Sequence, residues 1–91
     1  MSVIVRIPAV WQDATQRMRQ VDVPAGALGD VLAALTERCP PLRAKLFDGE
    51  GRLHSYVNLF INEEHIRFLG GLSAPLHDGD EIYIVPMVAG G

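Results

Sequence analysis

The chain has 91 residues, enough for one domain, and its 48% hydrophobic and 21% charged residues are typical of a globular protein. Its formal net charge of −3 argues against nucleic acid as the main partner, because such a partner requires a basic patch. The absence of a membrane-length apolar run and of a signal peptide predicts a cytoplasmic protein without a membrane partner, and the single cysteine, Cys39, excludes an internal disulfide.

The first part of the chain predicts a pair of strands. Residues 3–7 are rich in β-branched side chains, which favour a strand. Residues 9–16 are expected to form a connection, and residues 17–23 a second strand. Because the spacing between the two strands is short, we expect them to form an antiparallel hairpin.

Apolar residues next recur with the spacing of one helix face. Leu28, Val31, Leu32 and Leu35 stand at i, i+3, i+4 and i+7, which is the stripe of an amphipathic helix. We place this helix at about residues 27–38, although no Ser, Thr, Asp or Asn caps its start.

The second half of the chain predicts a short helical turn and three more strands. Residues 41–47 carry the turn, and residues 56–62 alternate between the two faces of a strand. Residues 65–68 are expected to form a short strand. Residues 81–85 form the last and most apolar strand, after an Asp-Gly-Asp turn.

This order of elements predicts an α+β domain. We expect a mixed sheet of four to five strands with one main helix packed on one face. The last strand is expected to pair in parallel with the first, because the intervening chain is long enough for a crossover. Residues 1–85 would form this domain, and residues 86–91 a flexible tail.

The tail ends on two glycines. Pro86 has no N–H to donate, so it is expected to end the strand ladder before the tail. Gly90 and Gly91 have no Cβ, so they can enter a channel that is too narrow for other residues. The terminal carboxylate is ionised at neutral pH, since α-carboxyl pKa values lie near ~3.5.

The tail and the order of the elements resemble a known family. Residues 78–91 read Asp-Gly-Asp-Glu-Ile-Tyr-Ile-Val-Pro-Met-Val-Ala-Gly-Gly, which resembles the C-terminus of the ubiquitin-like β-grasp sulfur carriers of the MoaD/ThiS family. The stretch Tyr-Val-Asn-Leu-Phe-Ile-Asn at residues 56–62, with the Arg-Phe pair at 67–68, looks most like the CysO-type carriers of cysteine biosynthesis.

The resemblance implies a carrier that is not itself an enzyme, with no catalytic residue, no metal and no bound cofactor. Gly91 would be adenylated by an ATP-dependent enzyme of the MoeB/ThiF type and converted to a thiocarboxylate. Val88, Ala89 and Gly90 would thread into the partner. A cysteine-synthase-like enzyme would accept the sulfur, and a JAMM-type metallopeptidase is implied as a further partner. Carriers for molybdopterin, thiamin or a specialised metabolite share this tail, so these pathways stay open.

A docking surface for such partners is expected on the outward face of the last strand. Tyr83 and Val85 should point outward there, while Ile82 and Ile84 face the core. With Phe60 and Met87 they would form an apolar patch beside the tail, of the kind that marks interaction sites.

Two functions of other classes remain open. The chain would be a ubiquitin-like modifier if its tail formed isopeptide bonds with other proteins, and Lys45 is its only lysine. It would be a non-covalent binding module if the tail were incidental. The three histidines show no metal-ligand spacing, and Cys39 is expected to be a plain, partly buried cysteine.

Overall fold

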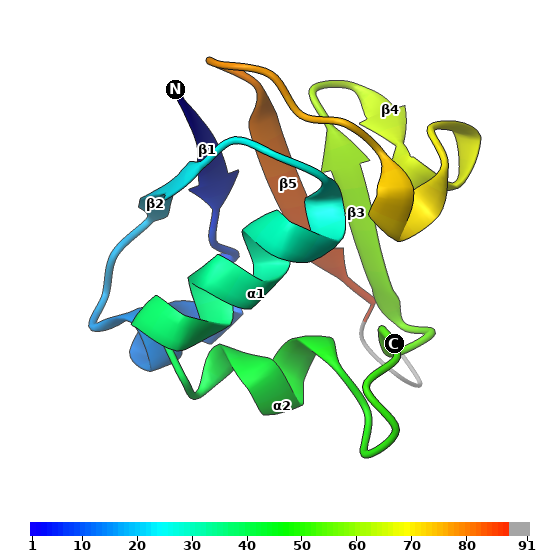
Figure 1. The fold of residues 1–91 in the computed structure, drawn as a ribbon. Helices are drawn as coiled ribbons and strands as arrows, with labels where there is room; N and C mark the ends of the chain where they lie inside the picture. The colour runs from blue at the N-terminus through cyan, green and yellow to red at the C-terminus, as the bar shows by residue number, and fades with distance from the viewer. Residues whose placement is uncertain (88–91) are drawn as a thin grey trace.

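The computed structural model describes residues 1–87. One mixed sheet contains five strands in the order β2-β1-β5-β3-β4, and α1 lies across one of its faces (Figure 1). The strands are β1 (Ser2–Arg6), β2 (Gln20–Pro24), β3 (Val57–Ile61), β4 (Glu64–His65) and β5 (Glu81–Pro86), and the helices are α1 (Leu28–Arg38) and α2 (Leu42–Leu46). This is the predicted β-grasp arrangement.

The pairing of the strands agrees with the prediction. β1 and β2 form an antiparallel hairpin, and β5 lies between β1 and β3 in the centre of the sheet. β5 is parallel to β1 and antiparallel to β3. The last strand of the chain is therefore held on both sides, and it gives the C-terminal residues a well-supported starting point.

The core lies between α1 and the inner face of the sheet. The predicted helical stripe is fully covered, since Leu28, Val31, Leu32 and Leu35 are each at most 1% exposed. Ala27 precedes the helix without a side-chain cap, as expected. The N–H of Leu28 instead donates to the carbonyl oxygen of Ala74 at 2.9 Å, so a distant loop satisfies one of the free amides at the helix start.

The expected connection between the first two strands is present at residues 9–16, and most of it forms a 3₁₀ helix, η1 (Ala9–Thr15). Its Trp11 is only 7% exposed and packs against the core. The buried Thr15 hydroxyl lies 3.2 Å from the carbonyl oxygen of Gln12 and 2.9 Å from that of Met18. This closes a turn in which residues 16 and 17 have positive φ, so β2 begins at residue 20 and not at residue 17.

The short strand expected at residues 65–68 is also wrong beyond its first residue. β4 ends at His65, and Ile66–Phe68 form a 3₁₀ helix, η2, before a further 3₁₀ turn, η3 (Gly71–Ser73). The Nδ1 atom of His65 accepts the N–H of Arg67 at 3.1 Å, and Ile66 turns into the core. This local cap replaces the ladder that a strand would need.

β5 ends at Pro86 and not at residue 85, which is a further correction, and Pro86 lies opposite Val57 of β3. The ladder thus stops at Pro86 as predicted, but the missing N–H is not the reason. The next N–H, that of Met87, donates to the carbonyl oxygen of Tyr56 at 2.6 Å. Hydrogen-bonded and non-bonded pairs alternate in antiparallel strands, so Pro86 occupies a pair that needs no N–H toward β3.

Candidate functional site

The residues predicted to carry the chemistry come after the end of the described chain. Val88, Ala89, Gly90 and Gly91 lie outside residues 1–87, so their threading and adenylation stay a prediction. The division into a domain and a flexible tail also stays a prediction, although Pro86 itself belongs to β5. The structure does place the point from which they extend. The backbone N–H of Met87 is bound to the carbonyl oxygen of Tyr56, and this fixes where the chain leaves the sheet.

An apolar hollow surrounds this exit point. Val10 of η1 is 72% exposed and Met87 is 61% exposed, although both side chains are large and apolar. The hollow is lined by Pro8, Ala9, Val10, Trp11, Tyr56, Pro86 and Met87. The structure thus places Met87 among η1 residues that the sequence pattern did not indicate.

The other three predicted interface residues meet on the open face of the sheet, opposite α1. Phe60 of β3 and Tyr83 of β5 are directly paired across the strands, and Val85 stands two residues later on the same face. Tyr83 is 38% exposed and Val85 is 44% exposed, as predicted for outward residues. A second hollow lies here, lined by Phe60, Asn62, Glu63, Glu81, Tyr83 and Val85.

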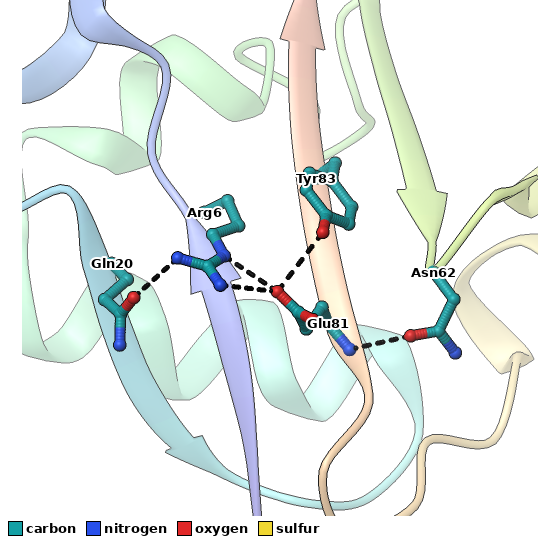
Figure 2. Close-up of polar contacts among 5 residues, drawn as sticks. All are labelled: Arg6, Gln20, Asn62, Glu81 and Tyr83. Atoms are coloured by element: carbon teal, nitrogen blue, oxygen red, sulfur yellow. Dashed lines mark hydrogen bonds and ion pairs between the residues drawn. The ribbon is translucent and has the colours of Figure 1, made fainter.

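A polar network that the sequence did not indicate borders this second hollow (Figure 2). Arg6 of β1 reaches Oε1 of Glu81 through Nε at 2.8 Å and Nη2 at 2.7 Å. Its Nη1 donates to Oε1 of Gln20 at 2.6 Å, and the hydroxyl of Tyr83 donates to Oε1 of Glu81 at 3.2 Å. The network joins three neighbouring strands and holds the tip of the Tyr83 ring.

The charges in this network stabilise each other. The hydrogen bond from Arg6, together with that from Tyr83, lowers the pKa of Glu81 below its ordinary value, since both bonds favour the carboxylate. The same contact with Glu81 raises the pKa of Arg6. Both groups are therefore charged at neutral pH, and the ion pair orients Tyr83 more than it stabilises the fold, because exposed pairs contribute little.

The turn into β5 is fixed by a second set of hydrogen bonds. Asn62 accepts the N–H of Glu81 at 3.2 Å, as Figure 2 shows, and donates to Asp80 at 3.3 Å. The other carboxylate oxygen of Asp80 accepts the N–H of His77 at 2.9 Å. This backbone hydrogen bond is the main reason why the pKa of Asp80 lies below its ordinary value.

His65 stands at the far side of Phe60. Its ring contacts the Phe60 ring edge-on, with 5.2 Å between centroids. Its Nε2 lies 2.9 Å from Oδ1 of Asn58, while its Nδ1 accepts the backbone N–H of Arg67. The two ring nitrogens thus have different partners, and these two contacts fix the orientation of the ring beside Phe60.

Residues 1–87 offer little for chemistry of their own. Among them, no group of three or more His, Cys, Asp or Glu side chains is placed to hold a metal ion. Cys39 is buried, at 5% exposure. None of the helices in this range combines the length and the apolar character needed to cross a membrane. This part of the chain provides an open sheet face with exposed Tyr83 and Val85, and a fixed point from which the chain continues beyond Met87.

Comparison with known proteins decides the family. The family model described as "ThiS family" matches residues 5–91. The chain belongs to the ThiS family. The predicted resemblance to MoaD/ThiS-family sulfur carriers is thereby confirmed, and with it the expectation that the chain is a carrier and not an enzyme, because its relatives are small carrier and modifier proteins.

Three proteins with similar sequences or structures show which members of the ThiS family this chain resembles. Sulfur carrier protein CysO of Mycobacterium tuberculosis is 37% identical, with all of both chains covered. In a crystal structure of the Amycolatopsis orientalis BexX/CysO complex, a chain superposes with a TM-score of 0.88 and 34% identity, over 98% of this chain and 99% of that one. Small archaeal modifier protein 3 of Haloferax volcanii is 34% identical over 70% of this chain and 68% of its own length.

Proposed function

We propose that this chain carries sulfur as a thiocarboxylate on Gly91 and delivers it for cysteine biosynthesis. An ATP-dependent adenylating enzyme of the MoeB/ThiF type joins the Gly91 carboxylate to AMP and releases pyrophosphate. A sulfur donor then displaces AMP, which leaves the –COS⁻ group on the tail. A carboxylate is a poor electrophile, so the adenylate is the species that makes the exchange of oxygen for sulfur feasible.

One observation carries this proposal, namely the full-length similarity to a protein named as a sulfur carrier, combined with the Gly-Gly ending. The geometry of the described residues agrees with it. β5 is paired on both sides, so the tail starts from a rigid root, and the open face beside it is available to a partner. The Amycolatopsis relative forms a complex with a partner protein, so a face for docking is also expected here.

Intact-protein mass spectrometry tests the proposal. The chain is incubated with the adenylating enzyme of its own organism, ATP and a sulfide source. The expected result is a mass increase equal to replacing one oxygen by sulfur, located to Gly91 by fragmentation. A variant with one alanine appended after Gly91 is the control and should remain unmodified. An unchanged mass, with the enzyme shown to be active on another carrier, would remove the carrier function.

The choice of pathway has its own test. The thiocarboxylate form is mixed with a cysteine-synthase-like enzyme that holds the aminoacrylate of its substrate. Delivery to cysteine predicts a product in which cysteine is attached to the Gly91 end, and a metallopeptidase of the JAMM type then releases it. If only a molybdopterin or thiazole synthase takes the sulfur, the carrier function stands and the cysteine assignment is wrong.

A second function, protein modification, is favoured by the similarity to small archaeal modifier protein 3. The activation step is the same, but the nucleophile that then attacks the adenylate is an amine and not sulfide. Lys45 is the only lysine that a second copy could use, and its Nζ lies 6.0 Å from the Trp11 ring centroid. High-mass conjugates in cells that disappear when Gly91 is deleted would support this function. A carrier that acts only in sulfur transfer forms none.

A further inference from the structure

The hollow on the open face has two chemically different sides. Phe60, Tyr83 and Val85 form an apolar and aromatic wall. Two acidic residues, Glu63 in the turn between β3 and β4 and Glu81 at the start of β5, also line the hollow. Glu81 already has Arg6 as its partner, but an apolar guest would leave Glu63 to be desolvated without one, and a small cation would leave the wall uncovered.

The charges that face this hollow do not cancel. Arg6 is bound to Glu81 and neutralises one carboxylate. Glu63 is exposed, and it belongs to none of the ion pairs found within residues 1–87. His65 lies on the other side of Phe60, with its Nε2 2.9 Å from Oδ1 of Asn58, and it does not line the hollow. The hollow therefore carries a net negative charge of its own, next to two aromatic rings.

A guest that suits both sides has a flat cation on an apolar stem. The arginine side chain has this form, since its guanidinium stacks on aromatic faces and donates several N–H groups to carboxylates. Lysine matches less well, because its compact ammonium is more strongly hydrated and has no flat face. Tyr83 is already oriented by its bond to Glu81, so the aromatic wall needs little rearrangement.

We propose that the hollow formed by Phe60, Tyr83, Val85, Glu63 and Glu81 receives an arginine side chain from the adenylating partner. This rests on the proposed function, because that partner must bind before any sulfur is loaded. The arginine stem covers Val85 and Phe60, and its guanidinium meets Tyr83 and the free carboxylate of Glu63. The contact sets the orientation of the carrier, so that the tail leaves toward the partner's active site.

A titration followed by NMR tests the hollow without the enzyme. The probe is N-acetyl-arginine N-methylamide, and its neutral isostere, the citrulline derivative, is the control ligand. The arginine probe should shift the amide signals of Phe60, Tyr83 and Val85, with a dissociation constant on the order of 10 mM. The citrulline probe should shift them far less. Equal shifts with both probes, or no shift at these residues, would overturn the proposal.

Two matched variants refine this test. Glu63→Gln removes the free carboxylate and should weaken binding of the arginine probe about threefold, as expected for one exposed ion pair. Glu64→Gln removes the neighbouring carboxylate in β4, which does not line this hollow, and should leave binding unchanged. Equal weakening by both variants would mean that only the overall charge matters, and would overturn the proposal.

The adenylating enzyme gives a second, independent measurement. In ATP–pyrophosphate exchange, Glu63→Gln should raise the KM for the carrier about threefold and leave kcat unchanged, because the contact is made in the bound state throughout. Added salt should raise the wild-type KM more than that of the variant. If the hollow binds the arginine probe but the enzyme never adenylates the wild-type chain, the proposed function fails and the arginine site stands.

Discussion

Replacing Val85 by glutamine separates docking from folding. Val85 lies on the open face and is 44% exposed, while its neighbour Ile84 points inward and is 5% exposed. Because the Val85 side chain is outside the core, Val85→Gln should change the free energy of unfolding by no more than about 1 kcal/mol, the usual span for strand substitutions. The fold therefore stays intact in the variant, and any larger effect must arise at the interface.

The loss of docking free energy in Val85→Gln depends on the fraction of the Val85 side chain that is exposed and can be covered by a partner. Full burial of a valine side chain contributes about 1.5–3 kcal/mol, so covering the remaining 44% at an interface contributes roughly 0.7–1.3 kcal/mol. The glutamine amide would in addition be desolvated without an assigned partner, at a cost of about 1–2 kcal/mol. Together these reach about 2–3 kcal/mol, which corresponds to a roughly 30- to 160-fold loss in kcat/KM for adenylation.

The assay is ATP–pyrophosphate exchange with the adenylating enzyme of the same organism, at carrier concentrations below KM. Phe68→Gln is the matched control, because Phe68 is 71% exposed but lies in η2, outside the hollow on the open face. Its kcat/KM should stay within about threefold of wild type. The docking assignment would be refuted if Val85→Gln were adenylated as fast as wild type, or if Phe68→Gln lost as much.

Three further predictions concern stability, measured by urea denaturation. Leu32→Ala removes a fully buried α1 side chain and should cost about 2–5 kcal/mol. Gly79→Ala should cost about 1 kcal/mol, because residue 79 has φ of 87° and an added Cβ would meet only strain and no neighbouring atom. The folded pKa values of Asp80 and Glu81 lie below their ordinary 3.8 and 4.5, so their contribution is complete above these values. It is lost as the pH falls through the lower folded values, so the denaturation midpoint should stay constant above about pH 5 and should drop as the pH is lowered below 4.5 and then below 3.8.

The strands and the main helix could be predicted because their patterns are local. Alternation in β5 separated Ile82 and Ile84 from Tyr83 and Val85, and the structure places all four as expected. The helix was indicated by the spacing of its leucines. Its start was less visible, since the cap comes from Ala74, a residue far along the chain, and no local pattern encodes such a contact.

The errors share a cause of the same kind. The sequence does not reveal η1, because its turn depends on the buried Thr15 hydroxyl and on two residues with positive φ, neither of which stands out in the sequence. The sequence predicts the end of β5 one residue early, because the residue type of Pro86 does not show which strand pair it occupies. Proline is tolerated in the strand only at a residue pair that needs no N–H toward β3. Which pair it occupies is set by the register of β5 with β3.

The candidate site also depends partly on local sequence and partly on contacts between residues that are distant in the chain. The chemistry of Gly91 stays a prediction from the sequence, since residues 88–91 lie outside the described part of the chain. The polar network beside the expected docking face could not be predicted, because Arg6 and Glu81 are 75 residues apart and meet only through the parallel pairing of β1 with β5. That pairing also supports β5 on the side away from β3. The same pairing between the two ends of the chain therefore brings Arg6 to Glu81 beside the hollow and fixes the strand that leads to residues 88–91, so the proposed docking and the proposed tail chemistry would depend on one element of the fold.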